Sequence, residues 1–307
     1  MSDLASTLDR PKTLQAIGLL LLAIICFDLM SVFIRFLLTD YSAQELSAYR
    51  NVIGIVPSIL LLLYTKELRF NGPRLIIKQW KLALLRGFSV AVAQLCYYSS
   101  IGYLELATVA TLGQTNAFFV VILSVILLRE RVGMWRWAAL FIGFTGAMLI
   151  LKPGADTFTI YALLPIGAAF FYGFSIATLP KFDKSISNAV LYLYSSVAAA
   201  IGAVVLAAFT TDFSPIISYL HLFMIFVMSI LGGIGVLFLM LAYRMVAPSI
   251  IAPFVYFGIL SSFIFGWIFF REFPVETLFP GVFLIVGSGV LIVWREGRAS
   301  KTQTFKI

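Results

Sequence analysis

The chain has 307 residues, of which 61% are hydrophobic and only 12% are charged, and its mean hydropathy is +1.02. Soluble domains carry about 25% charged residues, so this composition excludes a soluble protein and predicts an integral membrane protein. The formal net charge of +8 would indicate nucleic-acid binding in a soluble protein. Here the basic residues flank apolar runs, so we expect a lipid bilayer and no nucleic acid as partner.

Ten apolar runs approach the length of about 20 residues that a helix needs to cross the hydrocarbon core. In chain order they are 14–38, 45–65, 80–102, 106–128, 134–151, 159–180, 188–210, 219–242, 248–270 and 277–294. The connections between them are too short to hold a soluble domain. We therefore expect an all-α polytopic membrane protein with ten transmembrane helices and polar tails at 1–13 and 295–307.

The distribution of Lys and Arg predicts the orientation, because cytoplasmic loops are enriched in both. With the N-terminus in the cytoplasm, 18 of the 22 basic residues fall inside, among them the cluster over 66–86. Only Lys152 and Arg271 fall outside, while Arg35 and Arg50 lie within or at the edge of spans. This bias predicts an inner (plasma) membrane protein with both termini cytoplasmic.

Two segments indicate an internal repeat: "LLRERVGMWRWAALFIGFTGAMLILKPG" (127–154) and "FFREFPVETLFPGVFLIVGSGVLIVWREG" (269–297). Each has an apolar span, Arg-Glu, a short turn and a Gly-bearing span that ends on charge. The repeats would be 14–151 and 159–294, joined by a linker at 152–158, with five spans each. An odd number of spans inverts the second repeat, and inverted repeats are typical of alternating-access transporters with a central binding site.

The stretch "LELATVATLGQTNAFFVVILSVILLRERVGMWRWAALFIGFTGAMLILKPG" (104–154) resembles the signature of EamA-type transporters of the drug/metabolite transporter superfamily. "APFVYFGILSSFIFGWIFFREFP" (252–274) resembles the matching stretch of the second half. The resemblance implies a ten-helix secondary transporter with a central cavity. One difference is Asn116-Ala117, where the family commonly has a small residue and Pro.

Asp28 lies near the middle of the first span, in "IICFDLMSVFIRF". An ionisable residue inside a span is costly and by default faces a cavity. Arg35 follows two turns later, and Arg50 enters the second span. Asp28 is expected to bind a cationic group of the substrate or to carry a coupling proton; the alternative is a structural pair with Arg35 or Arg50. An acid here, with an arginine in the second span, resembles the branch that includes S-adenosylmethionine and riboflavin transporters.

Four further polar residues lie inside spans: Gln94 and Tyr98 in the third, and Gln114 and Asn116 in the fourth. A buried amide needs hydrogen-bond partners. We expect these side chains to line the substrate cavity; interhelical hydrogen bonds are the alternative for the two amides of the fourth span.

In the second half the deep polar residues are mainly aromatic, and Tyr172 and Tyr256 are the candidates for the cavity wall. Aromatic faces suit a flat or cationic ligand. Glu130 and Glu272 end their spans at opposite faces, and Pro248 and Pro253 open the ninth span. These four residues are expected to act in gating or in structure.

Secondary transport is the favoured function, since the chain has no G-x-x-x-x-G-K-[ST] motif for ATP. One His and two scattered Cys disfavour an intramembrane enzyme, and no filter sequence indicates a channel. The expected substrate is a small zwitterionic or cationic metabolite: S-adenosylmethionine first, with an aromatic amino acid or riboflavin as alternatives. A coupling proton or counter-substrate is expected, no cofactor or metal is, and the protein is expected to be a monomer or weak dimer.

Overall fold

The computed structural model of the chain describes residues 10–66, 77–104, 109, 112–113, 115–130, 132–151, 160–183, 185–271, 279–281, 283–291 and 294. Every regular element in these ranges is a helix, so the all-α prediction is confirmed. The α-helices are α1 (Arg10–Leu37), α2 (Ala43–Ile53), α3 (Val56–Tyr64), α4 (Trp80–Tyr103), α6 (Asn116–Leu128), α7 (Met134–Leu151), α8 (Leu163–Ala177), α9 (Asn188–Thr210), α10 (Tyr219–Met245), α11 (Pro248–Ile251) and α12 (Phe257–Phe270). Three short 3-10 helices adjoin them: η2 (Ile160–Ala162), η3 (Leu179–Lys181) and η4 (Ala252–Tyr256).

Seven helical stretches of the described chain are long and apolar enough to cross a membrane. They are Pro11–Leu37, Ala43–Tyr64, Trp80–Tyr103, Ile160–Lys181, Asn188–Thr210, Tyr219–Met245 and Pro248–Phe270. The apolar helix α6 is shorter, while α7 and the helical residues 283–291 occupy the two other predicted spans. Each of the ten predicted ranges therefore contains helix, and the chain is a multi-pass membrane protein.

The outside of the bundle is apolar. Leu60, Phe209 and Phe283 have 58%, 87% and 68% of their surface exposed. Water would disfavour so much exposed hydrocarbon, whereas lipid tails match it. The helical backbone satisfies its own hydrogen bonds, as a lipid-facing segment requires.

Two of the predicted spans are interrupted helices. The single helix expected over 45–65 is divided into α2 and α3 at Gly54, and Pro57 in the first turn of α3 has no N–H to continue the α2 ladder. In the ninth span, α11 and η4 precede α12, and Pro253 lies within η4. Interrupted helices are tolerated in membranes where they lie inside the protein rather than against lipid.

The fourth span also contains an irregularity, although it has no proline. Residues 109 and 112–113 are helical, Thr115 forms a turn, and α6 begins at Asn116. The Thr115 hydroxyl donates a 2.6 Å hydrogen bond to the Leu112 carbonyl. Asn116 is thereby placed at the first residue of α6.

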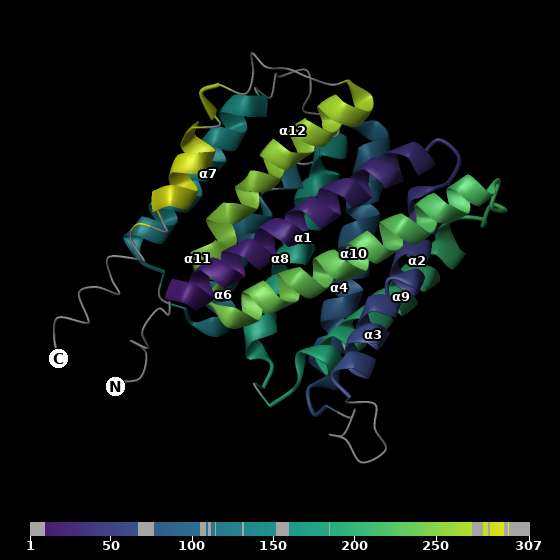
Figure 1. Cartoon of the computed structure of the whole chain (residues 1–307), viewed down its shortest axis with the longest axis horizontal. Helices are drawn as coiled ribbons and strands as arrows, with labels where there is room; N and C mark the ends of the chain where they lie inside the picture. The colour runs from purple at the N-terminus through teal and green to yellow at the C-terminus, as the bar shows by residue number, and fades with distance from the viewer. Residues whose placement is uncertain are drawn as a thin grey trace.

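The helices of the two halves of the chain pack on each other. Helix α1 lies between α10 and α12, as Figure 1 shows with α1 in purple between the two green helices. Helix α8 packs on α4 and α6, and α9 packs on α4 and α2. Helix α7 lies beside the yellow helical residues that follow α12, since a Cβ on Gly146 would be 3.0 Å from Ile285. Helices from both halves therefore surround the centre of the bundle.

Contacts at the helix ends give the relative direction of α1 and α12. Arg35 and Phe36, near the end of α1, contact Phe270, the last residue of α12. Helices α1 and α12 therefore run in the same direction, and α11 lies at the face of the bundle where α1 begins. We call this the α1-start face.

Candidate functional site

A cavity of about 190 Å³ lies at the centre of the bundle. Its wall is formed by α1, α2, α4, α8, α10, η4 and the first residues of α6 and α12. Six of the predicted site residues line it: Asp28, Arg50, Gln94, Tyr98, Asn116 and Tyr172. The volume is somewhat larger than the ~150 Å³ that holds a benzene molecule in a well-studied protein cavity. The structure thus brings together residues that the sequence separates by almost 150 positions.

Asp28 reaches from the middle of α1 to α12. Its carboxylate accepts a hydrogen bond from the Ser262 hydroxyl at 2.9 Å and another from the Ser261 hydroxyl. Both serines belong to the second half of the chain, 233 and 234 residues away. No ion pair joins Asp28 to Arg35 or Arg50, both of which lie within the described ranges. Asp28 is half-buried in the cavity wall, and within the described residues its carboxylate contacts neutral donors only.

Arg50 extends from α2 toward α10 and is only 5% exposed. Its Nη2 donates to the Gly232 carbonyl at 2.8 Å, and its Nη1 donates to Asn51 Oδ1 at 3.0 Å. Gly232 makes this contact possible, because a Cβ there would lie 2.5 Å from Arg50 Nε. Asn51 in turn donates to Gln94 Oε1, so one polar chain joins α10, α2 and α4 beside the cavity.

Arg86 is the functional candidate that the sequence analysis missed. The orientation count included it only as one of the basic residues on the cytoplasmic side, whereas in the structure Arg86 lies within α4, is 3% exposed and lines the cavity. Its Nε donates to the Ser175 carbonyl at 2.9 Å, and its Nη1 donates to Ser195 Oγ. The sequence feature that could have identified Arg86 is its position six residues into the apolar run that begins at Trp80.

Helices α4 and α9 approach closely next to Arg86. A Cβ on Gly87 would lie 2.4 Å from the Ala198 Cβ and 2.8 Å from the Ser195 carbonyl oxygen. Only glycine permits this approach, which brings Ser195 within reach of the arginine. The packing of small residues therefore sets the position of a buried cation.

Aromatic side chains cover much of the remaining wall. Tyr97, Tyr98, Tyr172 and Tyr243 all line the cavity. The Tyr98 hydroxyl lies 3.9 Å from Met30 Sδ, and the Tyr243 hydroxyl is buried with no hydrogen-bond partner in the part of the chain that the structure describes.

Asn116 presents an unsatisfied acceptor at the cavity. Its Oδ1 is buried, has no hydrogen-bond partner among the described residues, and lies beside Gly173 of α8. An unpaired buried amide oxygen is unfavourable unless a ligand or a water molecule donates a hydrogen bond to it. Gln114 lies outside the described residues.

The structure places four predicted residues away from the cavity. Arg35 lies with its guanidinium carbon 4.4 Å from the centre of the Phe270 ring, at the far end of α1. Tyr256 is fully buried beside Gly143 and Ser288. Pro248 is the first residue of α11, and Pro253 lies in η4.

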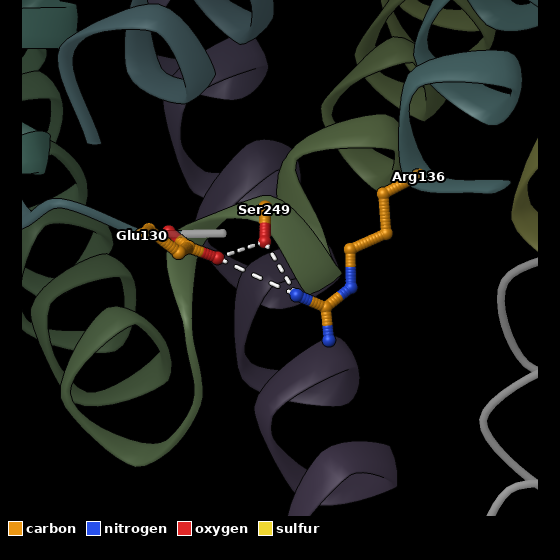
Figure 2. Close-up of polar contacts among 3 residues, drawn as sticks. All are labelled: Glu130, Arg136 and Ser249. Atoms are coloured by element: carbon orange, nitrogen blue, oxygen red, sulfur yellow. Dashed lines mark hydrogen bonds and ion pairs between the residues drawn. The ribbon is translucent and has the colours of Figure 1, made fainter. Parts of the chain in front are cut away.

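Glu130 belongs to a polar cluster at the α1-start face (Figure 2). Its Oε1 accepts from the Ser249 hydroxyl and lies 3.5 Å from Arg136 Nη1, which also donates to Ser249 Oγ at 3.0 Å. Glu130 follows α6 and Arg136 lies in α7, whereas Ser249 lies in α11 of the second half. The cluster joins the two halves at one face. Glu272, its expected counterpart, lies outside the described residues.

Comparison with known proteins agrees with this geometry. A profile of the EamA-like transporter family matches residues 14–152. A riboflavin transporter of Brucella anthropi is 32% identical over 202 residues, which cover 63% of this chain and 69% of that protein. The chain belongs to the EamA-like transporter family. The resemblance carried by residues 104–154 is therefore confirmed, and the protein is a transporter.

Other relatives align over nearly the whole chain. The pseudopaline exporter CntI of Pseudomonas aeruginosa is 25% identical over 282 residues, covering 91% of this chain and 96% of its own. An S-adenosylmethionine uptake transporter of Rickettsia conorii is 24% identical over 292 residues, covering 95% and 97%. A solved crystal structure superposes on 94% of this chain and 97% of its own with a TM-score of 0.76 at 14% identity, which shows that the two share a fold.

Proposed function

We propose that this EamA-family transporter moves a small zwitterionic or cationic metabolite by alternating access, and that the central cavity is its substrate site. The observation that carries the proposal is the position of Asp28. Its carboxylate lines the cavity, has no cationic partner among the described residues, and is held by Ser261 and Ser262 of the opposite half. A buried acid in this setting favours a cationic group or a proton as its partner.

S-adenosylmethionine is the favoured substrate. It has a sulfonium and an ammonium for Asp28 and a purine ring for the tyrosine wall. Riboflavin and aromatic amino acids are the alternatives, because the same wall suits any flat ring. A cavity of about 190 Å³ suits a single ring, so a larger metabolite requires the cavity to widen when one face opens.

The chain is further proposed to contain two inverted repeats, 14–151 and 159–294. Three observations support this arrangement. In the proposed repeats, α1, α4 and α6 correspond to α8, α10 and α12. Helix α1 packs on α10 and α12, and its counterpart α8 packs in the same way on α4 and α6. Arg129 and Arg271, which end α6 and α12, share a left-handed backbone with φ of 55° and 56°. Glu130 at the end of α6 meets Ser249 before α12, so the two equivalent helices run in opposite directions.

Topology and coupling follow from the same proposal. The bias of Lys and Arg supports cytoplasmic termini and an inner membrane location, even with Arg86 removed from the cytoplasmic count. Asp28 is the proposed carrier of a coupling proton if transport is proton-driven. No cofactor is proposed, and the transporter is proposed to act as a monomer or weak dimer.

Counterflow in liposomes tests the substrate assignment. Purified protein is reconstituted with unlabelled S-adenosylmethionine inside and labelled compound outside, with riboflavin and tryptophan in parallel experiments. We expect a transient accumulation of labelled S-adenosylmethionine well above that of protein-free liposomes. Accumulation of riboflavin or tryptophan alone would replace the favoured substrate, and no accumulation of any of the three would contradict the proposed substrate class.

A further inference from the structure

Arg50 and Arg86 line a second, smaller cavity as well as the central one. It has a volume of about 20 Å³, and Asn51, Tyr192 and Ser195 also line it. Arg50, Arg86, Val90 and Val236 belong to the walls of both cavities, so the two adjoin. A volume of this size holds about one water-sized group.

The two arginines have no counter-charge in the part of the chain that the structure describes. The ion pair between Arg136 and Glu130 involves neither of them, and each donates instead to neutral oxygens. Each is at least 95% buried. Two uncompensated cations inside a membrane bundle are unfavourable, and such residues by default serve a bound ion or substrate.

Three other polar side chains of the smaller cavity already donate their hydrogen bonds to oxygens of the protein. The Tyr192 hydroxyl donates to the Gly233 carbonyl, and the Ser195 hydroxyl donates to the Leu191 carbonyl at 2.8 Å. Asn51 donates to the Ser47 carbonyl at 2.7 Å and to Gln94. The guanidinium groups are thus the source of positive potential, and Arg50 Nε is buried with no hydrogen-bond partner in the described ranges.

We propose that Arg50 and Arg86 form an anion subsite at the junction of the two cavities, which takes a carboxylate group or a halide ion. Planar guanidinium groups bind carboxylates with charge-assisted hydrogen bonds. Because Asp28 lines the central cavity, a ligand there meets a negative group at one part of the wall and two positive groups at another. The anion is either the carboxylate of a zwitterionic substrate or a separate chloride. The first case rests on the proposed function and narrows the substrate class to zwitterions; the second does not depend on it.

Thermal unfolding of the purified full-length protein tests the subsite without any substrate. The melting temperature is measured in sodium chloride and sodium acetate, each titrated against a bulky buffer sulfonate at constant ionic strength. A saturable rise of about 2–4 °C with either small anion is expected for the wild type. Equal melting temperatures in all three salts would overturn the proposal.

Variants assign the effect to the two arginines. Arg86→Gln and Arg50→Gln are expected to lose the anion-dependent rise, whereas Lys81→Gln, at an exposed position of the same helix α4, is expected to keep it. Arg50→Lys retains the charge and is expected to keep a weaker response. A rise that persists in both Gln variants would overturn the subsite. If neither variant can be purified, the wild-type titration decides alone.

Competition in the counterflow experiment distinguishes the two sources of the anion. If the subsite binds the substrate carboxylate, decarboxylated S-adenosylmethionine should compete about tenfold to a hundredfold more weakly than the parent compound. In Arg86→Gln the two compounds should compete about equally. If chloride is the occupant, the two compounds compete equally and chloride changes the rate. If the two compounds compete equally and chloride has no effect, the subsite is overturned while the proposed transport stands. If small anions raise the melting temperature but no counterflow occurs, the subsite stands and the proposed transport is overturned.

Discussion

Asp28→Asn is expected to reduce transport to the background of protein-free liposomes while the protein still folds and inserts. Asn has nearly the same shape as Asp: its Oδ1 can accept from one of the two serines, and its Nδ2 can donate to the hydroxyl oxygen of the other. It has no charge for a cationic group and no proton to exchange. Because hydrogen bonds to charged groups contribute about 1.5–3 kcal/mol, the loss alone weakens substrate binding by about tenfold or more, and a proton-coupled cycle stops entirely.

The measurement is counterflow of labelled substrate at matched protein content, with monodispersity and melting temperature as the test of folding. Asp40→Asn is the matched control, because Asp40 is exposed just beyond the end of the same helix and contacts Thr39. The control should transport like the wild type. Normal counterflow by Asp28→Asn would show that the cavity carboxylate is not part of the mechanism.

Glu130→Ala is expected to open the α1-start face. The substitution removes both the hydrogen bond from Ser249 and the ion pair with Arg136, which join the end of α6 to α11 across the two halves (Figure 2). The pair is partly exposed, with 21% and 13% of the two side chains accessible, so the ion pair itself contributes little. The bond from Ser249 to the carboxylate is the larger contribution, and its loss should shift the balance toward the open face by about tenfold.

A cysteine in place of Ile176 reports this opening, in a background with Cys26 and Cys96 replaced by Ser. Ile176 lines the cavity, is 5% exposed and belongs to the same apolar cluster as Leu20 near the start of α1. Its labelling by a water-soluble maleimide should be about tenfold faster in Glu130→Ala than in the parent. Asp212→Ala, at an exposed site between α9 and α10, should leave the rate unchanged. Equal labelling in Glu130→Ala would mean that the cluster does not hold this face closed.

The positions of the helices along the chain were largely predictable from the sequence, because membrane insertion requires long apolar segments. Asp28 could be identified in the same way, since a charge inside such a segment is conspicuous. Its partners could not: Ser261 and Ser262 are common residues in an apolar run, and only the packing of α1 on α12 brings them to the carboxylate.

Arg86 shows a different limit. Hydropathy locates the ends of a span only to within a few residues, and Lys78 and Lys81 precede Arg86 closely in the sequence. The depth of Arg86 depends on where α4 begins and on the close approach of α9 at Gly87. A basic residue near a span end is therefore ambiguous until its neighbours in space are known.

Tyr256 shows that a residue aligned with a cavity candidate of the other repeat need not line the cavity itself. It is the counterpart of Gln114 when Glu130 is aligned with Glu272, yet η4 directs it toward Gly143 and away from the wall. The break at Gly54 was likewise hidden, since the apolar run over the second span continues on both sides of it. Local backbone irregularities, rather than composition, decide these positions.

We propose that the two halves of the chain move against each other around the cavity during transport. A reversible disulfide tests this motion. The native Glu130 and Ser249 side chains are in hydrogen-bond contact, so Glu130→Cys and Ser249→Cys are combined in the Cys26→Ser, Cys96→Ser background. Oxidation should cross-link the halves and stop counterflow, and reduction should restore it, while each single cysteine variant transports in both conditions. Undiminished counterflow by protein whose cross-link is verified by mass would contradict the account.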